Sequence, residues 1–218
     1  MKQELAQTYS SMIQTLKKIK VVPVVKIEDA KQAVPLGKAL IAGGLPCAEI
    51  TFRTSAAAEA IGLLTKEVPE LLVGAGTVLT PEQADAAKKA GAKFMVSPGF
   101  NPRVVDHCLA MDMPIFAGIN NPTGIEMALE RGLPAVKFFP AEASGGLAML
   151  KAMAAPYGDI LFMPTGGVNA KNIGTYLAFP RVLACGGSWM VPSDLISAGE
   201  FDKITALTKE AVEAVAGL

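Results

Sequence analysis

Two charged residues stand inside short apolar segments that are typical of buried β-strands. Glu49 lies in segment 47–52 and Lys137 in segment 135–139. Burying an unpaired charge is costly, and a strand core would otherwise hold Val or Leu at these positions. A structural ion pair and a functional pair are the two interpretations, and on residue type alone they carry equal weight.

Lysine in a confined, partly apolar pocket could act as a nucleophile. Such a lysine loses hydration of its charged form, which favours the neutral amine. The neutral amine of Lys137 can attack a ketone and form an iminium ion, which accepts electrons when a carbon–carbon bond two atoms away breaks. Glu49 would move protons, first in dehydrating the carbinolamine and then at the hydroxyl of the cleaved bond. The catalytic candidates are therefore Lys137 and Glu49.

Strand alternation predicts that both charges point into the protein interior. On the interior side we also expect Cys47, Thr51, Arg53, Ala135 and Phe139, while Ala48, Ile50, Phe52, Val136 and Phe138 face the helices. Glu49 and Lys137 precede Thr54 and Pro140 by a few residues, so both approach the carboxyl ends of their strands. Barrel enzymes place their chemistry there, which favours function over a structural pair.

The segments around these residues alternate between strand and helix. Strands are predicted at 21–25, 47–52, 71–73, 94–96, 115–117, 135–139, 160–163 and 182–185, and helices at 1–20, 28–41, 55–68, 81–90, 102–111 and 201–216. Eight βα units without a linker predict one α/β domain over 1–218, a (β/α)8 TIM barrel with an additional N-terminal helix. A doubly wound open sheet is the alternative, but no glycine fingerprint follows the first strand.

Glycine pairs follow the seventh and eighth predicted strands. Either pair alone is typical of an ordinary helix-entry turn, but loops at these two barrel positions often bind phosphate. The candidates there are Thr165, Gly166, Gly167 and Ser188. Residues 74–76 are expected to form a third close-approach loop, in which Thr77 could bind a carboxylate or carbonyl oxygen. Arg53 could hold a substrate carboxylate, although a surface salt bridge is equally compatible with its position.

Composition excludes several classes of partner. Twenty Lys and Arg balance twenty Asp and Glu, so no net field would attract nucleic acid or an anionic membrane. The N-terminal segment is polar and predicts no secretory leader, so we expect a cytoplasmic protein. Cys47, Cys108 and Cys185 form no CxxC pair and are expected to be buried free thiols. His107 is expected on a helix surface, and we predict neither a metal nor another cofactor.

Six motifs together identify a family resemblance. They are 49–54 (EITFRT), 74–79 (GAGTVL), 97–99 (SPG), 137–142 (KFFPAE), 164–167 (PTGG) and 187–189 (GSW). In this order the chain resembles the 2-keto-3-deoxy-6-phosphogluconate (KDPG) aldolases over nearly its whole length. By that resemblance Lys137 is the Schiff-base lysine and Glu49 the general acid/base.

The resemblance also implies a substrate, an assembly and binding residues. Arg53 and Thr77 would contact the pyruvate portion, and the phosphate end would lie among Thr165, Gly166, Gly167 and Ser188. Pro98 and Phe139, which lie within the motifs, are also assigned to substrate binding. The family implies a metal-free homotrimer that cleaves KDPG to pyruvate and glyceraldehyde 3-phosphate, and some members also cleave 4-hydroxy-2-oxoglutarate.

The sequence departs from the family pattern at two places, and three other functions are compatible with it. Residues 117–124 (AGINNPTG) replace a Pro-Gly…Thr-Pro-Thr-Glu pattern, which leaves substrate breadth open. Phe52 replaces a usual Leu, but it faces the helices and should not affect chemistry. The alternatives are an aldolase for the galactonate epimer, a non-catalytic phosphosugar-binding barrel and an interaction module, the last of which would leave the inward charges unexplained.

Overall fold

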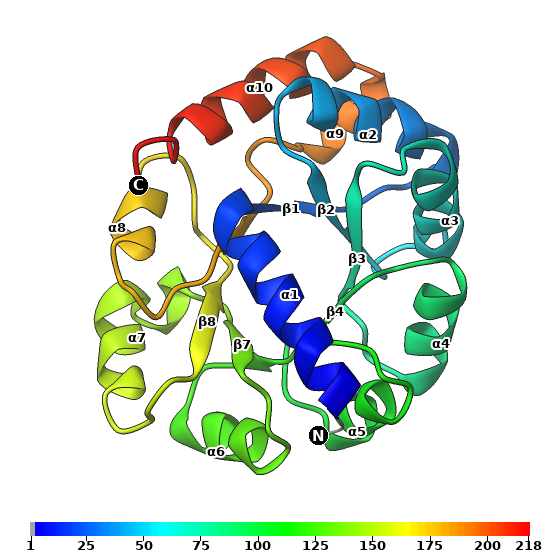
Figure 1. The fold of residues 1–218 in the computed structure, drawn as a ribbon. Helices are drawn as coiled ribbons and strands as arrows, with labels where there is room; N and C mark the ends of the chain where they lie inside the picture. The colour runs from blue at the N-terminus through cyan, green and yellow to red at the C-terminus, as the bar shows by residue number, and fades with distance from the viewer. Residues whose placement is uncertain (1–2) are drawn as a thin grey trace.

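The computed structural model describes residues 3–218 as an α/β fold. Parallel strands curl around a shared interior and the helices lie outside them (Figure 1). The strands are β1 (Val21–Val25), β2 (Cys47–Thr51), β3 (Leu72–Gly76), β4 (Met95–Val96), β5 (Ile115–Phe116), β6 (Gly118–Ile119), β7 (Ala135–Phe138), β8 (Leu161–Pro164) and β9 (Cys185–Gly187).

Ten α-helices occur within residues 3–218. They are α1 (Gln3–Ile19), α2 (Ala33–Ala42), α3 (Ala57–Glu67), α4 (Pro81–Lys89), α5 (Pro102–Ala110), α6 (Pro122–Glu130), α7 (Gly146–Ala154), α8 (Ile173–Leu177), α9 (Ser193–Ala198) and α10 (Phe201–Glu213). Two short 3-10 helices, η1 (Ala30–Gln32) and η2 (Glu142–Ser144), precede α2 and α7. Met1 and Lys2, which the predicted first helix includes, lie outside the described residues. In the described range no helix is long and apolar enough to cross a membrane.

The strands pair in two parallel sheets. One has the order β5-β4-β3-β2-β1-β9 and the other the order β6-β7-β8. Parallel bridges between Phe162 and Val182 and between Thr165 and Gly186 connect β8 with the segment of β9. At the opposite junction only Ala117 separates β5 from β6, and its carbonyl accepts a hydrogen bond from the Lys137 amide at 3.0 Å.

Each predicted strand segment overlaps an observed strand, but most boundaries differ, and the predicted strand 182–185 meets β9 only at Cys185. Residues 74–76 belong to β3 rather than to a loop, and 186–187 belong to β9 rather than to the turn after it. The predicted strand 115–117 is divided because β5 pairs with β4 whereas β6 pairs with β7. Packing requires a glycine within β3, because a Cβ at Gly74 would lie 2.2 Å from the ring of Phe94.

The predicted helix start signals are confirmed for α4 and α5. The side chain of Thr80 accepts a hydrogen bond from the Gln83 amide, and that of Asn101 accepts one from the Arg103 amide. Each cap precedes a proline at the first helical position, where the missing N–H has no partner to lose. The predicted helix 28–41 is instead divided into η1 and α2.

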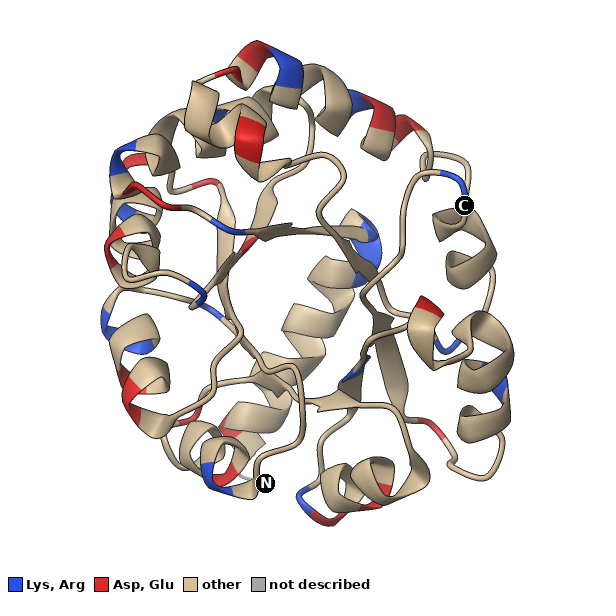
Figure 2. Ribbon diagram, turned by 180° about the vertical axis from the view of Figure 1, so that it is seen from behind, with Lys and Arg blue, Asp and Glu red and all other residues tan. Residues whose placement is uncertain are grey.

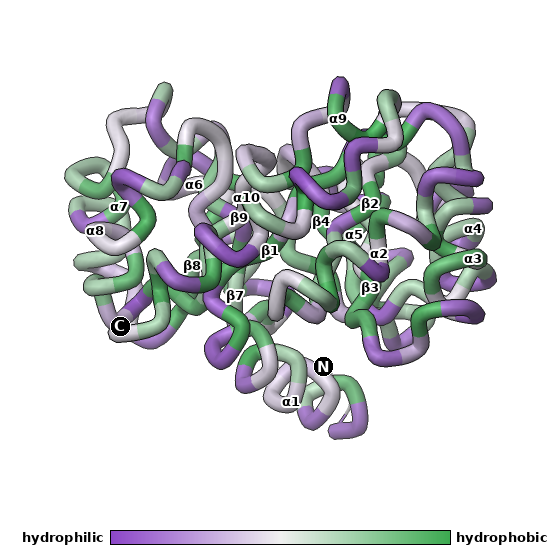
Figure 3. Tube along the Cα trace, turned by 90° about the horizontal axis from the view of Figure 1, so that it is seen from above, coloured by the Kyte–Doolittle hydropathy of each residue, from purple (hydrophilic) through white to green (hydrophobic). Residues whose placement is uncertain are grey.

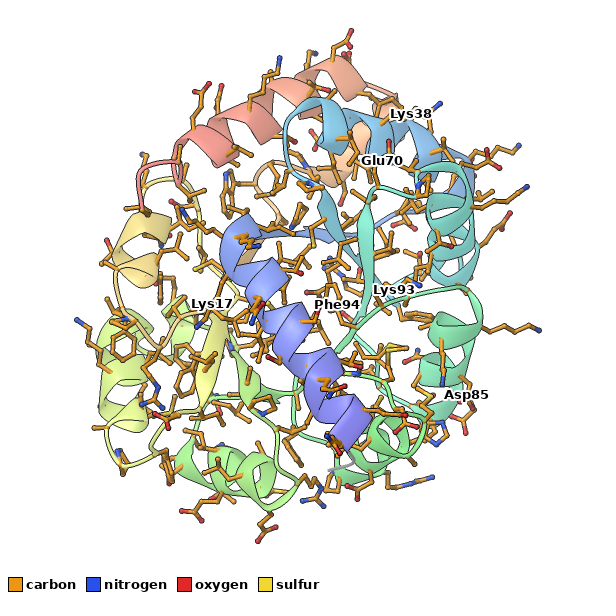
Figure 4. The ribbon with its side chains drawn as sticks, in the orientation of Figure 1. Lys17, Lys38, Glu70, Asp85, Lys93 and Phe94 are labelled. Carbon is orange, nitrogen blue, oxygen red and sulfur yellow. The ribbon has the colours of Figure 1, made fainter. Side chains whose placement is uncertain are left out.

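Helix α1 covers the amino-terminal ends of the strands. It crosses the strands in Figure 1 and lies outside the body of the fold in Figure 3. Its inner face buries Leu5, Tyr9, Met12 and Leu16. Met12 and Leu16 pack with interior residues that include Phe94, which Figure 4 labels beside the helix. Helix α1 thus closes the interior at this end, and a ligand must enter from the opposite end.

Tyr9→Phe is expected to destabilise the fold. The Tyr9 hydroxyl is buried, donates to the Ile115 carbonyl at 3.0 Å and accepts from the Ile115 amide at 2.7 Å. Its removal leaves both backbone groups without this partner, and we expect the free energy of unfolding to fall by about 1–3 kcal/mol in urea titration. Tyr157→Phe is the control, because that hydroxyl binds Glu126 at an exposed site. Equal stability of the two variants would contradict the prediction.

Candidate active site

Strand alternation places the candidate side chains as predicted. Cys47 and Ala135 pack in the interior cluster beneath α1, whereas Ala48, Ile50, Val136 and Phe138 pack in the larger cluster between strands and helices. Phe52 packs against that larger cluster too. Figure 2 shows most charged residues on the outer helices and loops. Within residues 3–218, Glu49 and Lys137 are the charged residues that are buried, as the strand pattern predicts.

Lys137 and Glu49 form a buried pair. Lys137 Nζ lies 3.7 Å from Glu49 Oε1, with Lys137 5% exposed and Glu49 fully buried. In the described part of the chain neither carboxylate oxygen of Glu49 has a hydrogen-bond partner. Lys137 Nζ also lies 5.0 Å from the ring centroid of Phe139. The amine is therefore largely removed from bulk water, with a carboxylate beside it and an aromatic face nearby.

Gly76 makes room for the Glu49 carboxylate. A Cβ at position 76 would lie 2.1 Å from Glu49 Oε1, closer than any side chain could approach. Residues 49 and 76 lie on the neighbouring strands β2 and β3, in which Glu49 pairs with Gly74 and Thr51 with Gly76. Gly76 is thus required by the position of the Glu49 carboxylate and not by a turn.

A cavity of about 310 Å³ opens above the pair at the carboxyl ends of the strands. It is lined by Val24, Arg53, Thr77, Pro98, Lys137, Phe139, Thr165, Gly166, Gly167, Val168, Gly187 and Ser188. All eight predicted substrate-binding residues are present, together with Lys137. Glu49 lies beneath the lining, in contact with Lys137.

Val24, Val168 and Gly187 line the cavity but are absent from the predicted set. Gly187 lies within the motif 187–189 and Val168 directly follows the motif 164–167, so both glycine segments already indicated this part of the lining. Val24 could have been found by applying strand alternation to β1, where it is the only partly exposed residue.

The carboxylate-binding candidates are held by local contacts. Arg53 Nε donates to Thr51 Oγ1 at 3.0 Å, and that hydroxyl donates to the Val25 carbonyl at 2.7 Å. This contact holds Arg53, which lines the cavity, and a guanidinium group can form two parallel hydrogen bonds to a carboxylate. Thr77 has a φ of 55°, a conformation that a β-branched residue rarely adopts. Such a backbone is typical of functional sites.

The turn after β8 is built around two glycines in the left-handed region. Gly166 has a φ of 95° and Gly167 a φ of 84°. The Gly167 carbonyl accepts hydrogen bonds from Asn169 Nδ2 and Asn172 Nδ2, both at 3.1 Å. These bonds fix the orientation of the turn, and Ser188 lines the same cavity from the end of β9. The two glycine segments thus meet at one side of the cavity.

Asn120 and Asn121, which depart from the family pattern, lie beside this cavity and do not line it. Both residues line a neighbouring hollow of about 450 Å³, which shares Pro98 with the main cavity. Asn121 Oδ1 accepts a hydrogen bond from the Gly124 amide and caps α6. Asn121 therefore stabilises the start of helix α6 at the edge of the site.

The three cysteines and His107 do not line this cavity, and their environments are those that the sequence predicts. Cys47, Cys108 and Cys185 are buried free thiols, and burial raises the pKa of all three, that of Cys108 to about 12. His107 Nε2 lies 2.7 Å from Asp85 Oδ1 on the outer surface of α4 and α5. Figure 4 shows Asp85 at the periphery. Lys137 is consequently the nucleophilic candidate of this cavity.

These features define a class: an α/β protein with a ligand cavity at the carboxyl ends of parallel strands and a buried Lys–Glu pair at its floor. A sequence profile described as "Aldolase: KDPG and KHG aldolase" matches residues 12–207. The chain belongs to this family of KDPG and KHG aldolases.

Individual relatives agree with the family assignment. A 2-dehydro-3-deoxy-phosphogluconate aldolase of Treponema pallidum is 54% identical over 205 residues, which cover 94% of this chain and 98% of the relative. The KDPG aldolase of Legionella pneumophila, solved with pyruvate captured at low pH as a covalent carbinolamine, is similar with a TM-score of 0.85 and 39% identity over 88% of this chain and 93% of that one. The Zymomonas mobilis aldolase solved with 3-phosphoglycerate has a TM-score of 0.84 and 44% identity over 91% and 94%.

Proposed function

We propose that this chain is a class I aldolase that cleaves KDPG to pyruvate and glyceraldehyde 3-phosphate. The observation that carries the proposal is the buried contact between Lys137 Nζ and Glu49 at the floor of the cavity. The carbinolamine described for the Legionella pneumophila relative supports covalent chemistry at a lysine. The profile match and the named relatives support the reaction.

The reaction follows from the chemistry of these two residues. The neutral Lys137 amine adds to the C2 ketone to give a carbinolamine, and Glu49, acting as the acid, protonates its hydroxyl so that water leaves and an iminium ion remains. Glu49 takes the proton of the C4 hydroxyl, the C3–C4 bond breaks, and its electron pair moves to the iminium as glyceraldehyde 3-phosphate leaves. Protonation of the resulting enamine at C3 and hydrolysis of the imine release pyruvate and restore the amine.

The other lining residues hold the two ends of the substrate. Arg53 and Thr77 bind the carboxylate next to the ketone, while Pro98 and Phe139 shape the cavity around the reacting carbons. The phosphate binds among Thr165, Gly166, Gly167 and Ser188. Gly186 supports this end, since a Cβ there would lie 2.4 Å from Thr165 Oγ1.

The fold proposal is a closed (β/α)8 barrel that forms one domain. The bridges between β8 and the β9 segment, and the single residue between β5 and β6, support closure of the two sheets into one ring. The homotrimer and the cytoplasmic location remain predictions from the family resemblance and the composition. Sedimentation analysis of the purified protein tests the trimer.

A second substrate, 4-hydroxy-2-oxoglutarate, is favoured by the family to which the chain belongs, which covers KDPG and KHG aldolases. This compound has no phosphate, so its cleavage requires Lys137, Glu49 and the carboxylate-binding residues but not the glycine turns. Asn120 and Asn121 line a neighbouring hollow and not the main cavity, so we do not expect them to contact this substrate.

Trapping and turnover test the proposal together. Borohydride added with pyruvate should reduce the imine and add the mass of a pyruvate-derived group to the peptide that carries Lys137. Pyruvate release from KDPG, coupled to a dehydrogenase, should confirm turnover, and the galactonate epimer tested beside it establishes epimer preference. No added mass would eliminate the covalent mechanism, and ligand binding without pyruvate release would instead support a non-catalytic sugar-phosphate binder.

A further inference from the structure

Glu142 packs behind the glycine turn of the proposed phosphate site without lining the cavity. Its amide donates to the Gly166 carbonyl at 3.0 Å. A Cβ at Gly167 would lie 2.6 Å from both Cβ and Cγ of Glu142, so this side chain touches the turn directly. The conformation of 166–167 therefore depends on where Glu142 is held.

Tyr176 of α8 holds the Glu142 carboxylate. The phenol hydroxyl donates to Glu142 Oε1, and Tyr176 is only 1% exposed. Burial, assisted by the hydrogen bond and charge of Glu142, raises the pKa of Tyr176, so the phenol stays a hydrogen-bond donor. The bond also lies against Gly146, where a Cβ would lie 3.3 Å from Glu142 Oε1 and 3.4 Å from Tyr176 Oη.

The same helix supports the turn by a second route. Asn172, the residue before α8, donates its side-chain amide to the Gly167 carbonyl at 3.1 Å. Asn172 Oδ1 accepts from the Asn169 amide at 2.8 Å, which connects the end of the turn to the helix. Helix α8 thus holds Gly167 through Asn172 and contacts it through Tyr176 and Glu142.

We propose that Tyr176 and Glu142 are positioning residues that set the preference of the site for a phosphorylated substrate. The hydrogen bond fixes the Glu142 stem against Gly167 and keeps the carboxylate charge beside Gly146. Without this bond the carboxylate is free to approach a bound phosphate dianion and repel it, and the turn loses its support. This inference rests on the proposed function, because it requires that the turn binds the substrate phosphate.

The test compares ligands with and without a phosphate in the full-length protein. Tyr176→Phe removes only the hydroxyl. We expect the KM for KDPG to rise about fivefold or more, and the inhibition constant of inorganic phosphate to rise with it. The pyruvate concentration that gives half-maximal borohydride trapping on Lys137 should stay unchanged, because pyruvate does not reach the turn.

Matched variants separate positioning from general stability. Tyr157→Phe breaks another Tyr–Glu hydrogen bond, to Glu126 on the surface, and should change neither constant. Glu142→Gln keeps an acceptor for Tyr176 without the charge and should retain a KM close to that of the parent protein. Glu142→Ala should raise the KM, and combining it with Tyr176→Phe should add little, because both remove the same bond.

The outcomes distinguish failure of this inference from failure of the proposed function. If the parent protein neither traps pyruvate nor cleaves KDPG, the proposed function itself is wrong. An active parent whose Tyr176→Phe variant leaves the KM for KDPG unchanged overturns the positioning role alone. A variant in which the KDPG and pyruvate constants rise equally also overturns it, because the effect is then not specific to the phosphate end.

Discussion

Lys137→Met should abolish imine trapping by pyruvate and lower the kcat for KDPG cleavage by about 10⁴- to 10⁶-fold. Methionine has no side-chain amine and cannot form an imine, so the covalent route is lost and only binding and orientation remain. The measurements are the mass of the borohydride-treated peptide and the rate of pyruvate release. A variant that still released pyruvate at the parent rate would show that another group carries the chemistry.

Stability must be measured beside activity, because Lys137→Met leaves Glu49 fully buried without its partner at 3.7 Å. Breaking a buried pair by removing one member costs about 3–5 kcal/mol. Lys137→Arg keeps the positive charge beside Glu49 but cannot form the imine, so it should be inactive with less loss of stability. If the pair were only structural, the parent would also lack activity, and the two variants would differ in stability alone.

The inward direction of the catalytic candidates could be predicted because strand alternation is a local rule. Once β2 and β7 are recognised, the apolar residues at 48, 50, 136 and 138 fix the side of the strand that faces the helices. Glu49 and Lys137 must then face the interior, where they meet at 3.7 Å. The same rule applied to β1 would have added Val24 to the cavity lining.

The strand boundaries at glycines could not be predicted from local pattern. Gly74 and Gly76 suggest a loop when the segment is considered alone, yet they lie in β3 because Phe94 and Glu49 fill the space beside them. Likewise, the change of partner at Ala117 depends on which strands lie on either side. The Tyr176–Glu142 bond joins residues 34 positions apart, and neither residue type signals the other.

Glu49→Gln should lower the kcat for KDPG cleavage by about 10²- to 10⁴-fold, the usual contribution of a positioned general acid/base. Glutamine has nearly the same size and fits the same fully buried position, but it cannot accept the proton of the C4 hydroxyl. Trapping of pyruvate should be slowed yet still detectable, because the Lys137 amine is retained. Parent-like cleavage by Glu49→Gln would assign the proton transfer to another group or to water.

Gly76→Ala tests the same assignment without altering either catalytic candidate. The added Cβ would lie 2.1 Å from Glu49 Oε1, so the carboxylate has to move away from its place beside Lys137. The kcat should fall while Lys137 remains in the protein, with a smaller loss than in Glu49→Gln because the acid is displaced rather than removed. Gly62→Ala on α3 is the matched control, since a Cβ there meets nothing within 4 Å. If both alanine variants cleaved KDPG at the parent rate, the position of the Glu49 carboxylate would not limit the reaction.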